Sequence, residues 1–143
     1  MSKIPDRTVY ENELANLLQR ENEHWVAMTS GNNQGWDVTL MQQGEDINWC
    51  EMLPIEVKTS IKKRVQLTAH KREREQVRWY KNLWWNHTIS TYYAFRRMGG
   101  SPVEDIKDRW RFFHIENVGK GITWSQGMTY QHFVDKLRAE RLW

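Results

Sequence analysis

Residues 53–59 of the 143-residue chain alternate between apolar and polar side chains, and this alternation constrains the fold more than any other feature. In a β-strand, side chains at i and i+2 point to the same face, so Glu56 and Lys58 are expected to project together while Ile55 and Val57 point into the core. With a second carboxylate from a neighbouring strand, this pair would form a site for a hard divalent cation such as Mg²⁺. Such a site is suited to the hydrolysis of phosphodiester bonds.

The second carboxylate of this hypothetical site is Asp37, which opens the strand predicted over residues 36–41. Two acidic side chains with Lys58 beside them supply the oxygen ligands and the positive charge that hydrolysis at phosphorus requires. Simpler structural roles stay open at this stage. An aspartate at the start of a strand is often a turn residue, and Glu56 with Lys58 could be an exposed ion pair worth at most about 1 kcal/mol.

Charge is distributed unevenly along the chain, although the net charge is only +3. Residues 1–61 contain four lysines and arginines against ten acidic residues, whereas residues 62–81 contain eight against two. A concentrated positive segment is what counterion displacement on DNA requires, but a solvated helix face has the same composition. The positions that we expect to contact DNA are Lys62, Lys63, Arg64, Lys71, Arg72, Arg74 and Arg78.

Hydrophobic periodicity predicts one α/β domain with a central mixed five-stranded sheet flanked by helices. Thr68 is expected to cap the second helix, and Pro54 implies that its strand is entered late or begins as an edge. The last helix has four apolar residues on one face: Tyr130, Phe133, Val134 and Leu137. Helices are expected over residues 8–22, 68–85 and 129–141, and strands over residues 25–29, 36–41, 49–59, 88–97 and 109–115.

Composition excludes several classes of protein. No apolar run approaches the ~18 residues of a membrane-spanning helix, and the N-terminal residues lack the apolar stretch of a signal peptide, so we expect a cytoplasmic protein with no membrane partner. Cys50 is the single cysteine, which excludes an internal disulfide and a Cys-based zinc cluster. The five histidines do not share metal-binding spacing on one helix face, so a His-based zinc site is not expected either.

Three short blocks of sequence carry a family resemblance: Glu11-Asn12-Glu13-Leu14 followed by Leu17-Leu18, then Asp37-Val38, then Ile55-Glu56-Val57-Lys58. In this order they resemble the PD-(D/E)XK nuclease superfamily, which implies a restriction-endonuclease-like core. Within it, the chain is most similar to the archaeal-type Holliday junction resolvases, which are cellular or viral. A weaker match precedes the last helix, at Ser125-Gln126-Gly127-Met128.

The sequence departs from the family pattern at three places. Trp36 stands before the aspartate, where the superfamily's name has proline. The loop at residues 42–48 is longer than expected, and residues 62–86 are unusually basic and rich in tryptophan. These departures affect the path that DNA would follow more than the acidic residues themselves.

The resemblance implies a role for each matching residue. Asp37 and Glu56 would bind Mg²⁺, for which Mn²⁺ is a substitute, with the Val57 carbonyl as a further ligand. Lys58 would orient or deprotonate the attacking water and offset charge on the phosphorane. Glu11 would be another ligand, directly or through water, although a glutamate at this position could instead cap the helix that it begins.

Other positions match the family less closely. Ser30 would correspond to a functional serine on a mobile loop, and Gln76 to a helix glutamine near the site. Spacing alone does not decide whether Glu11 or Glu13 faces the active site. An aromatic block is expected in the core or at a dimer interface rather than as a base-stacking platform: Trp79, Tyr80, Trp84 and Trp85.

The leading hypothesis is that residues 1–143 form a single nuclease domain that cleaves four-way DNA junctions with Mg²⁺. The family works as a two-fold homodimer, which would place two sites on opposed strands of branched double-stranded DNA. A viral member would act in the host cytoplasm. The alternatives are another PD-(D/E)XK nuclease, such as a restriction, nicking or repair endonuclease, and a non-catalytic DNA-binding module that uses its basic segment alone.

Overall fold

The computed structural model describes residues 7–30, 36–43, 50–99, 102–103 and 105–139. Within these ranges, no helix has the length and apolar character needed to cross a bilayer. The helices are α1 (Arg7–Glu21), α2 (Lys71–His87) and α3 (Tyr130–Ala139). The strands are β1 (Trp25–Thr29), β2 (Val38–Gln43), β3 (Cys50–Ser60), β4 (Arg64–Gln66), β5 (Tyr92–Arg97), β6 (Trp110–His114), β7 (Gly121–Thr123) and β8 (Met128–Thr129). Single turns of 3₁₀ helix are η1 (Ile106–Arg109), η2 (Ile115–Asn117) and η3 (Trp124–Gln126).

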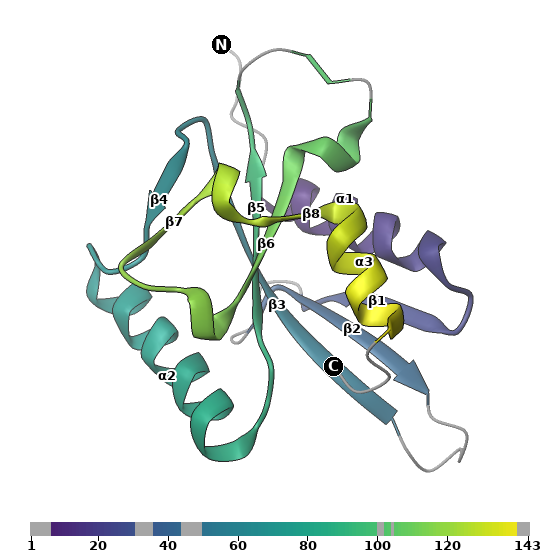
Figure 1. Cartoon of the computed structure of the whole chain (residues 1–143), viewed down its shortest axis with the longest axis horizontal. Coiled ribbons are helices and arrows are strands. Elements are labelled where there is room, and N and C mark those ends of the chain that lie inside the picture. Colours follow the sequence, from purple (N-terminus) through teal and green to yellow (C-terminus); the bar gives the residue numbers. More distant parts are fainter. Residues whose placement is uncertain (1–6, 31–35, 44–49, 100–101, 104, 140–143) are drawn as a thin grey trace.

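The strands form a six-stranded mixed sheet in the order β1-β2-β3-β5-β6-β8 and a separate two-stranded ribbon of β4 with β7 (Figure 1). β3 and β5 run parallel, whereas the other neighbours in the large sheet are antiparallel. Parallel neighbours need a crossover, which β4 and α2 supply. The predicted α/β class with a mixed sheet is confirmed. The sheet has six strands rather than five because β8 pairs with β6, and its two residues carry too little pattern to be recognised in a sequence.

The two faces of the large sheet are covered by different helices. On one face, α1 and α3 bury a cluster that includes Ile55 and Val57 of β3. On the other face, α2 buries Val77 and Tyr80 in a second cluster, with residues of β5 and β6. Successive side chains of a strand point to opposite faces. Glu56 lies between two residues of the first cluster and therefore faces the layer of α2.

Helix α2 differs from its predicted start and is followed by a later strand than expected. It begins at Lys71 with His70 as the N-cap residue, so Thr68 is not its cap. The Thr68 hydroxyl instead donates to the Lys120 carbonyl at 3.4 Å. At the other end, Thr88 adopts the left-handed conformation (φ 53°, ψ 30°) that ends the helix. Residues 88–91 therefore connect the helix to the next strand, and β5 begins at Tyr92.

Pro54 lies where β3 changes from an edge strand to a central strand. Residues 50–55 pair with β2, whereas pairing with β5 begins only at Ile55. The proline cannot donate a backbone hydrogen bond, and it falls on the half of β3 that has a single neighbour. The prediction from Pro54 is confirmed.

Candidate active site

Glu56 is a buried carboxylate on the central strand β3, with 1% of its surface exposed. The Tyr80 hydroxyl of α2 donates to Glu56 Oε2 at 3.0 Å. Lys58 Nζ lies 3.8 Å from Glu56 Oε1, and its side chain is 13% exposed. The two side chains thus share one face, as alternation predicts, and they do not form an exposed surface pair. A charge buried this deeply needs partners, which Tyr80 and Lys58 supply.

Asp37 is attached to β3 directly beside Glu56. Its backbone N–H donates to the Ile55 carbonyl at 3.1 Å, and its Oδ2 accepts a hydrogen bond from the Val57 N–H at 2.8 Å. The aspartate therefore does more than open a turn, because its side chain is directed onto the peptide that joins Glu56 to Val57. The structure brings Asp37, Glu56 and Lys58 together on one short stretch of the sheet.

Two buried tyrosines surround the carboxylates. Burial, followed by the negative charge of Glu56, raises the pKa of Tyr80 well above its usual value, and the same two causes raise the pKa of Tyr93. Asp37 contributes in the same direction to both. Both phenols therefore stay protonated and act as donors at neutral pH. Within the described part of the chain, the Tyr93 hydroxyl has no hydrogen-bond partner. Buried hydroxyls of this kind are found where water or a ligand completes a site.

The donor set fits a hard divalent cation that keeps part of its hydration shell. Mg²⁺ is commonly held by one or two carboxylates, with waters and substrate phosphate oxygens filling the other positions. Asp37 and Glu56 provide two carboxylates, and the unpartnered Tyr93 hydroxyl nearby provides a donor for a water or phosphate oxygen. Among the described residues, no three His, Cys, Asp or Glu side chains lie close enough together to hold a metal ion. The protein ligands that the structure assembles are therefore two carboxylates rather than a closed metal cage.

Ser30 lies beside Asp37 at the end of β1. Its N–H donates to the Asp37 carbonyl at 3.0 Å, and its hydroxyl donates to the Trp36 carbonyl at 2.5 Å. These contacts close the connection between β1 and β2, whose residues 31–35 lie outside the described residues. The catalytic role predicted for Ser30 stays a prediction, and the observed role of its hydroxyl is to hold the backbone next to Asp37.

Trp36 and Trp79 form an aromatic pair next to the carboxylates that the sequence analysis did not identify. Their rings are stacked with centroids 6.2 Å apart, and Trp79 is 47% exposed. Trp36 directly precedes Asp37, Trp79 directly precedes Tyr80, and Gln76 lies one helical turn before Tyr80. Trp36, which stands where the family pattern has proline, was the sequence signal for this pair, because a large aromatic ring next to the site needs a neighbour to pack against.

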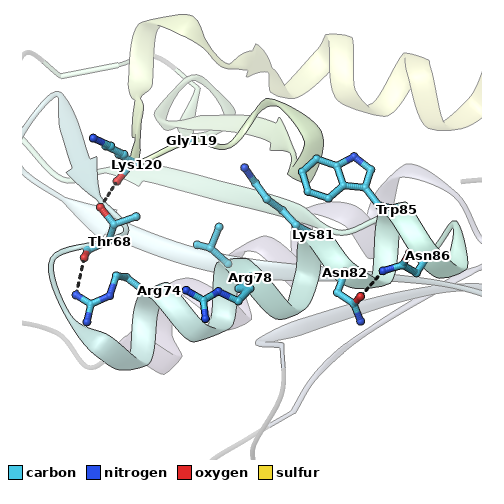
Figure 2. Close-up of a pocket in the computed structure, with 10 residues that line it drawn as sticks. Thr68, Arg74, Arg78, Lys81, Asn82, Trp85, Asn86, Gly119 and Lys120 are labelled. Atoms are coloured by element: carbon cyan, nitrogen blue, oxygen red, sulfur yellow. Dashed lines mark hydrogen bonds between the residues drawn. The ribbon is translucent and has the colours of Figure 1, made fainter.

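The seven predicted DNA-binding residues are all exposed, but they occupy two places. Lys62 and Lys63 lie between β3 and β4, and Arg64 opens β4, where its Nη1 donates to Thr123 Oγ1 at 3.0 Å. The other four lie on the first half of α2: Lys71, Arg72, Arg74 and Arg78. Figure 2 shows Arg74 and Arg78 on one side of this helix, next to Lys81 and Trp85. The basic side of α2 therefore combines residues that were predicted to bind DNA, such as Arg74 and Arg78, with Lys81, which was not.

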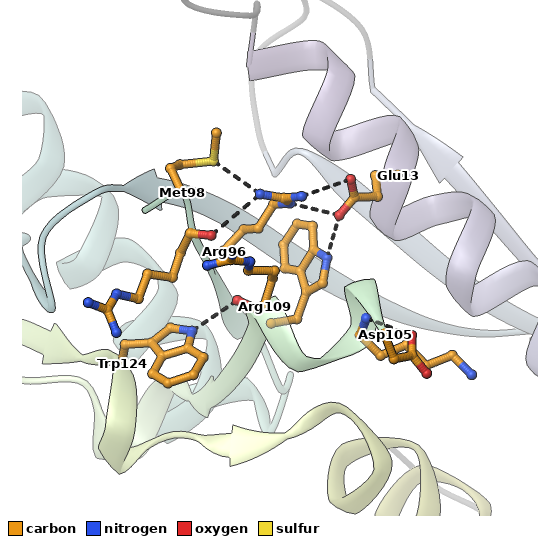
Figure 3. Close-up of polar contacts among 9 residues, drawn as sticks. Glu13, Arg96, Met98, Asp105, Arg109 and Trp124 are labelled. Carbon is orange, nitrogen blue, oxygen red and sulfur yellow. Dashed lines mark hydrogen bonds and ion pairs between the residues drawn. The ribbon is translucent and has the colours of Figure 1, made fainter. Parts of the chain in front are cut away.

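Glu11 and Glu13 are separated by their surroundings. Glu13 is bound by two residues of the sheet: Arg96 donates to its two carboxylate oxygens at 2.7 and 3.2 Å, and Trp110 Nε1 donates at 2.8 Å (Figure 3). Glu13 therefore anchors α1 to β5 and β6. Glu11 is 4% exposed and makes polar contacts. It is not the helix cap that we considered, because α1 begins at Arg7, four residues earlier. Its predicted role as a metal ligand stays a prediction.

Comparisons with known proteins agree with this fold. The family model described as "Protein NO VEIN, C-terminal" matches residues 7–92, which include Asp37, Glu56, Lys58 and α2. Among solved structures, the chain is similar to Hjc, a Holliday junction resolvase of the archaeal hyperthermophile Archaeoglobus fulgidus, with a TM-score of 0.57, 18% identity and coverage of 87% of this chain and 92% of that chain. The curated proteins gave no match. The restriction-endonuclease-like fold predicted from the sequence is confirmed.

Proposed function

This chain belongs to the family described as Protein NO VEIN, C-terminal, and we propose that it is a Mg²⁺-dependent endodeoxyribonuclease that cleaves four-way DNA junctions. The observation that carries the proposal is that Asp37, just before β2, accepts a hydrogen bond from the Val57 N–H next to Glu56 on β3, while Lys58 Nζ lies 3.8 Å from Glu56 Oε1. The structural likeness to Hjc supports a nuclease fold around these residues. The proposal treats residues 1–143 as a single nuclease domain.

In the proposed mechanism, Asp37 and Glu56 would hold the divalent ion together with the Val57 carbonyl, and Glu11 would act on it through water rather than as a third carboxylate ligand. Mg²⁺, or Mn²⁺ in its place, would supply charge to the phosphate and lower the pKa of a bound water. Tyr80 positions the Glu56 carboxylate through its hydrogen bond at 3.0 Å. These contacts orient the carboxylates before substrate arrives, which preorganises the site for charge that develops later.

Lys58 acts on the reacting groups. Its ammonium orients the attacking water, and its charge offsets the negative charge that develops on five-coordinate phosphorus. The water oxygen forms a bond to phosphorus while the bond from phosphorus to the leaving oxygen breaks. One end of the cut strand keeps the phosphate and the other keeps a hydroxyl. A lysine suits this place because its ammonium is a compact charge with three N–H donors on a flexible stem.

Paired cuts in a junction require two such sites, and we propose a two-fold homodimer. Support comes from an apolar strip on β1, β2 and β3. Val26 pairs with Met41, and Met41 pairs with Met52, so their side chains lie in one row. Val26 is 46% and Met52 53% exposed. Exposed apolar rows of this kind are typical of interfaces. Sedimentation velocity of Met41→Lys should show a monomer where the wild-type protein is dimeric.

A cleavage assay on a synthetic four-way junction tests the nuclease proposal. Wild-type protein should make paired nicks with Mg²⁺ and none in EDTA. Asp37→Asn and Glu56→Gln keep an oxygen that can accept the hydrogen bonds described above but lose the charge, and each should reduce cleavage by about 10³-fold. Asp135→Asn on α3, an exposed carboxylate, is the matched control and should cut normally. Normal cutting by both active-site variants would refute the proposal.

The same assay separates the alternatives. Equal cleavage of the junction and of plain duplex with the same sequence would favour a restriction, nicking or repair endonuclease. Junction binding that survives EDTA, with no cleavage at any divalent ion, would favour a DNA-binding module. The junction-specific proposal requires a clear preference for the branched substrate.

A further inference from the structure

A pocket of about 540 Å³ lies on the basic side of α2, between the helix and residues 119–120 (Figure 2). This volume falls in the ~300–1,000 Å³ range of small-ligand sites. Its lining combines four cations, one tryptophan and two amides with a few small or apolar groups: Thr68, Arg74, Val77, Arg78, Lys81, Asn82, Trp85, Asn86, Gly119 and Lys120. No carboxylate is among these lining residues, so the pocket selects an anion.

The wall opposite α2 is held in place by backbone contacts. The Lys120 carbonyl accepts hydrogen bonds from the Leu67 N–H at 2.8 Å and from the Thr68 hydroxyl at 3.4 Å. Gly121 begins β7, and a Cβ at this position would lie 2.5 Å from the Val65 carbonyl oxygen. Only glycine allows the ribbon to close this tightly, which brings Lys120 to the pocket.

Arg74 is oriented toward the same place before any ligand arrives. Its Nη1 donates to the Thr68 carbonyl at 3.0 Å and to the Ala69 carbonyl at 3.5 Å. A guanidinium held by two carbonyls still has further N–H groups to offer a phosphate. The anion-binding side of the pocket is therefore partly preorganised, which lowers the entropy cost of binding.

Trp85 adds a flat apolar surface beside the cations. Its side chain is 65% exposed, so it does not lie in the core, and Lys81 Nζ lies 5.6 Å from its ring centroid. An exposed indole next to cations is suited to stacking a nucleobase whose phosphate is bound nearby, and such stacking works for every base. Asn82 and Asn86 offer amide groups to the base edge.

We propose that this pocket binds a short segment of an unpaired DNA strand, with its phosphates on Arg74, Arg78 and Lys120 and one of its bases stacked on Trp85. The inference rests on the proposed function for the identity of the strand, and it adds a place where the enzyme holds unpaired DNA that adjoins the branch. Tyr80 faces Glu56 from the opposite side of the same helix, so strand holding and cleavage are assigned to two sides of α2. A free nucleoside phosphate shares this chemistry.

Fluorescence anisotropy of a labelled octathymidine strand tests the pocket in EDTA, on a Glu56→Gln background that cannot cut. Trp85→Ala and Arg78→Ala should each weaken binding on the order of tenfold, as expected for the loss of one base–aromatic stack or one phosphate contact. Trp85→Phe restores an aromatic face and should bind within about threefold of the parent. Arg20→Ala removes the same charge from an exposed position on α1, outside the pocket and outside the predicted DNA-binding residues, and should also stay within about threefold.

Equal losses in Arg20→Ala and Arg78→Ala would overturn the inference. Unchanged binding in Trp85→Ala, with circular dichroism showing an intact fold, would also overturn it. Competition then separates the two sources. Displacement by thymidine monophosphate at far lower concentration than by inorganic phosphate supports a nucleotide pocket open to free nucleotides, and displacement by oligonucleotide alone supports a strand site. Equal displacement by inorganic phosphate and thymidine monophosphate overturns base stacking.

Strand binding without junction cleavage would refute the nuclease proposal alone, and cleavage with unaltered strand binding in the variants would refute the pocket alone.

Discussion

Helix α2 has two sides that differ in almost every physical property. One side carries Tyr80, which is fully buried and donates its hydroxyl to the Glu56 carboxylate. The other side carries Arg78 and Trp85, which are exposed and line a pocket without a carboxylate. The first side belongs to a site that attracts cations, and the second to a site that attracts anions.

The difference shows how a small domain keeps two opposite electrostatic fields apart. A helix with its side chains is about 10–12 Å wide, which is comparable to the Debye length of about 8–10 Å at physiological ionic strength. Surface cations on the far side are therefore largely screened from the buried carboxylates. Burial keeps the field of Glu56 local, whereas exposure lets Arg78 attract a polyanion from solvent.

The largest expected effect comes from removing one cation on each side. Lys58→Met should lower the junction cleavage rate at saturating DNA by about 10²- to 10³-fold, the range for loss of one preorganised group that stabilises developing charge. Junction binding in EDTA should change less than about threefold. Arg78→Met should show the reverse, with weaker binding and a normal rate at saturation. Single-turnover cleavage measures the rate, and anisotropy measures binding. The same changes in rate and binding in both variants would show that the two sides of the helix do not have separate roles.

A smaller effect is expected from removing one hydrogen-bonding group on each side. Tyr80→Phe leaves the buried Glu56 carboxylate without its phenol donor, and should lower the free energy of unfolding by about 1–3 kcal/mol. Asn82→Ala alters an exposed amide and should stay within about 0.5 kcal/mol. Urea denaturation followed by tryptophan fluorescence gives both values. A loss in Asn82→Ala as large as that in Tyr80→Phe would show that the two sides do not differ in their packing.

Alkaline pH sharpens the comparison further. Burial and the Glu56 charge raise the pKa of Tyr80 above the value of about 10 that it has in the unfolded chain. Above this pH the unfolded chain loses the proton that the folded chain keeps, so Tyr80 contributes fully to stability below pH 10 and less as pH rises. Between pH 10 and 11, the free energy of unfolding of Tyr80→Phe should therefore fall by about 1 kcal/mol less than that of the wild-type protein. Parallel declines in urea titrations at both pH values would contradict this.

The smallest effect concerns salt. Because Arg78 is proposed to contact a phosphate of an unpaired strand, the slope of log K against log salt concentration for octathymidine binding should become shallower by about 0.7 in Arg78→Ala. The slope for Lys58→Met should stay as in the wild-type protein, because its side chain is largely buried. Anisotropy at several salt concentrations measures both slopes. A shallower slope for Lys58→Met alone would contradict the assignment of strand binding to the Arg78 side of the helix.

Sequence reasoning reached the carboxylates but not their supports. Alternation along residues 53–59 correctly placed Glu56 and Lys58 side by side on one face of the strand. It also correctly placed Val57 in the core. The hydrogen bond from Val57 to Asp37 joins residues 20 positions apart, and no local pattern specifies it. The same holds for Glu13, whose partners Arg96 and Trp110 lie 83 and 97 positions away. Spacing could not distinguish Glu13 from Glu11 because both occupy one helix, and only distant partners separate them.

By itself, the sequence determined the elements whose pattern repeats within a few residues: the alternating strand at β3 and the amphipathic helix α3, whose four predicted apolar residues are all buried. Tertiary structure alone decided the short strands β4, β7 and β8, the stack of Trp36 on Trp79, and the pocket between α2 and Lys120. The reason is physical. Backbone geometry imposes a period that a chain records locally, whereas contacts between distant segments depend on how whole layers pack, and a sequence records that only in the sum of its interactions.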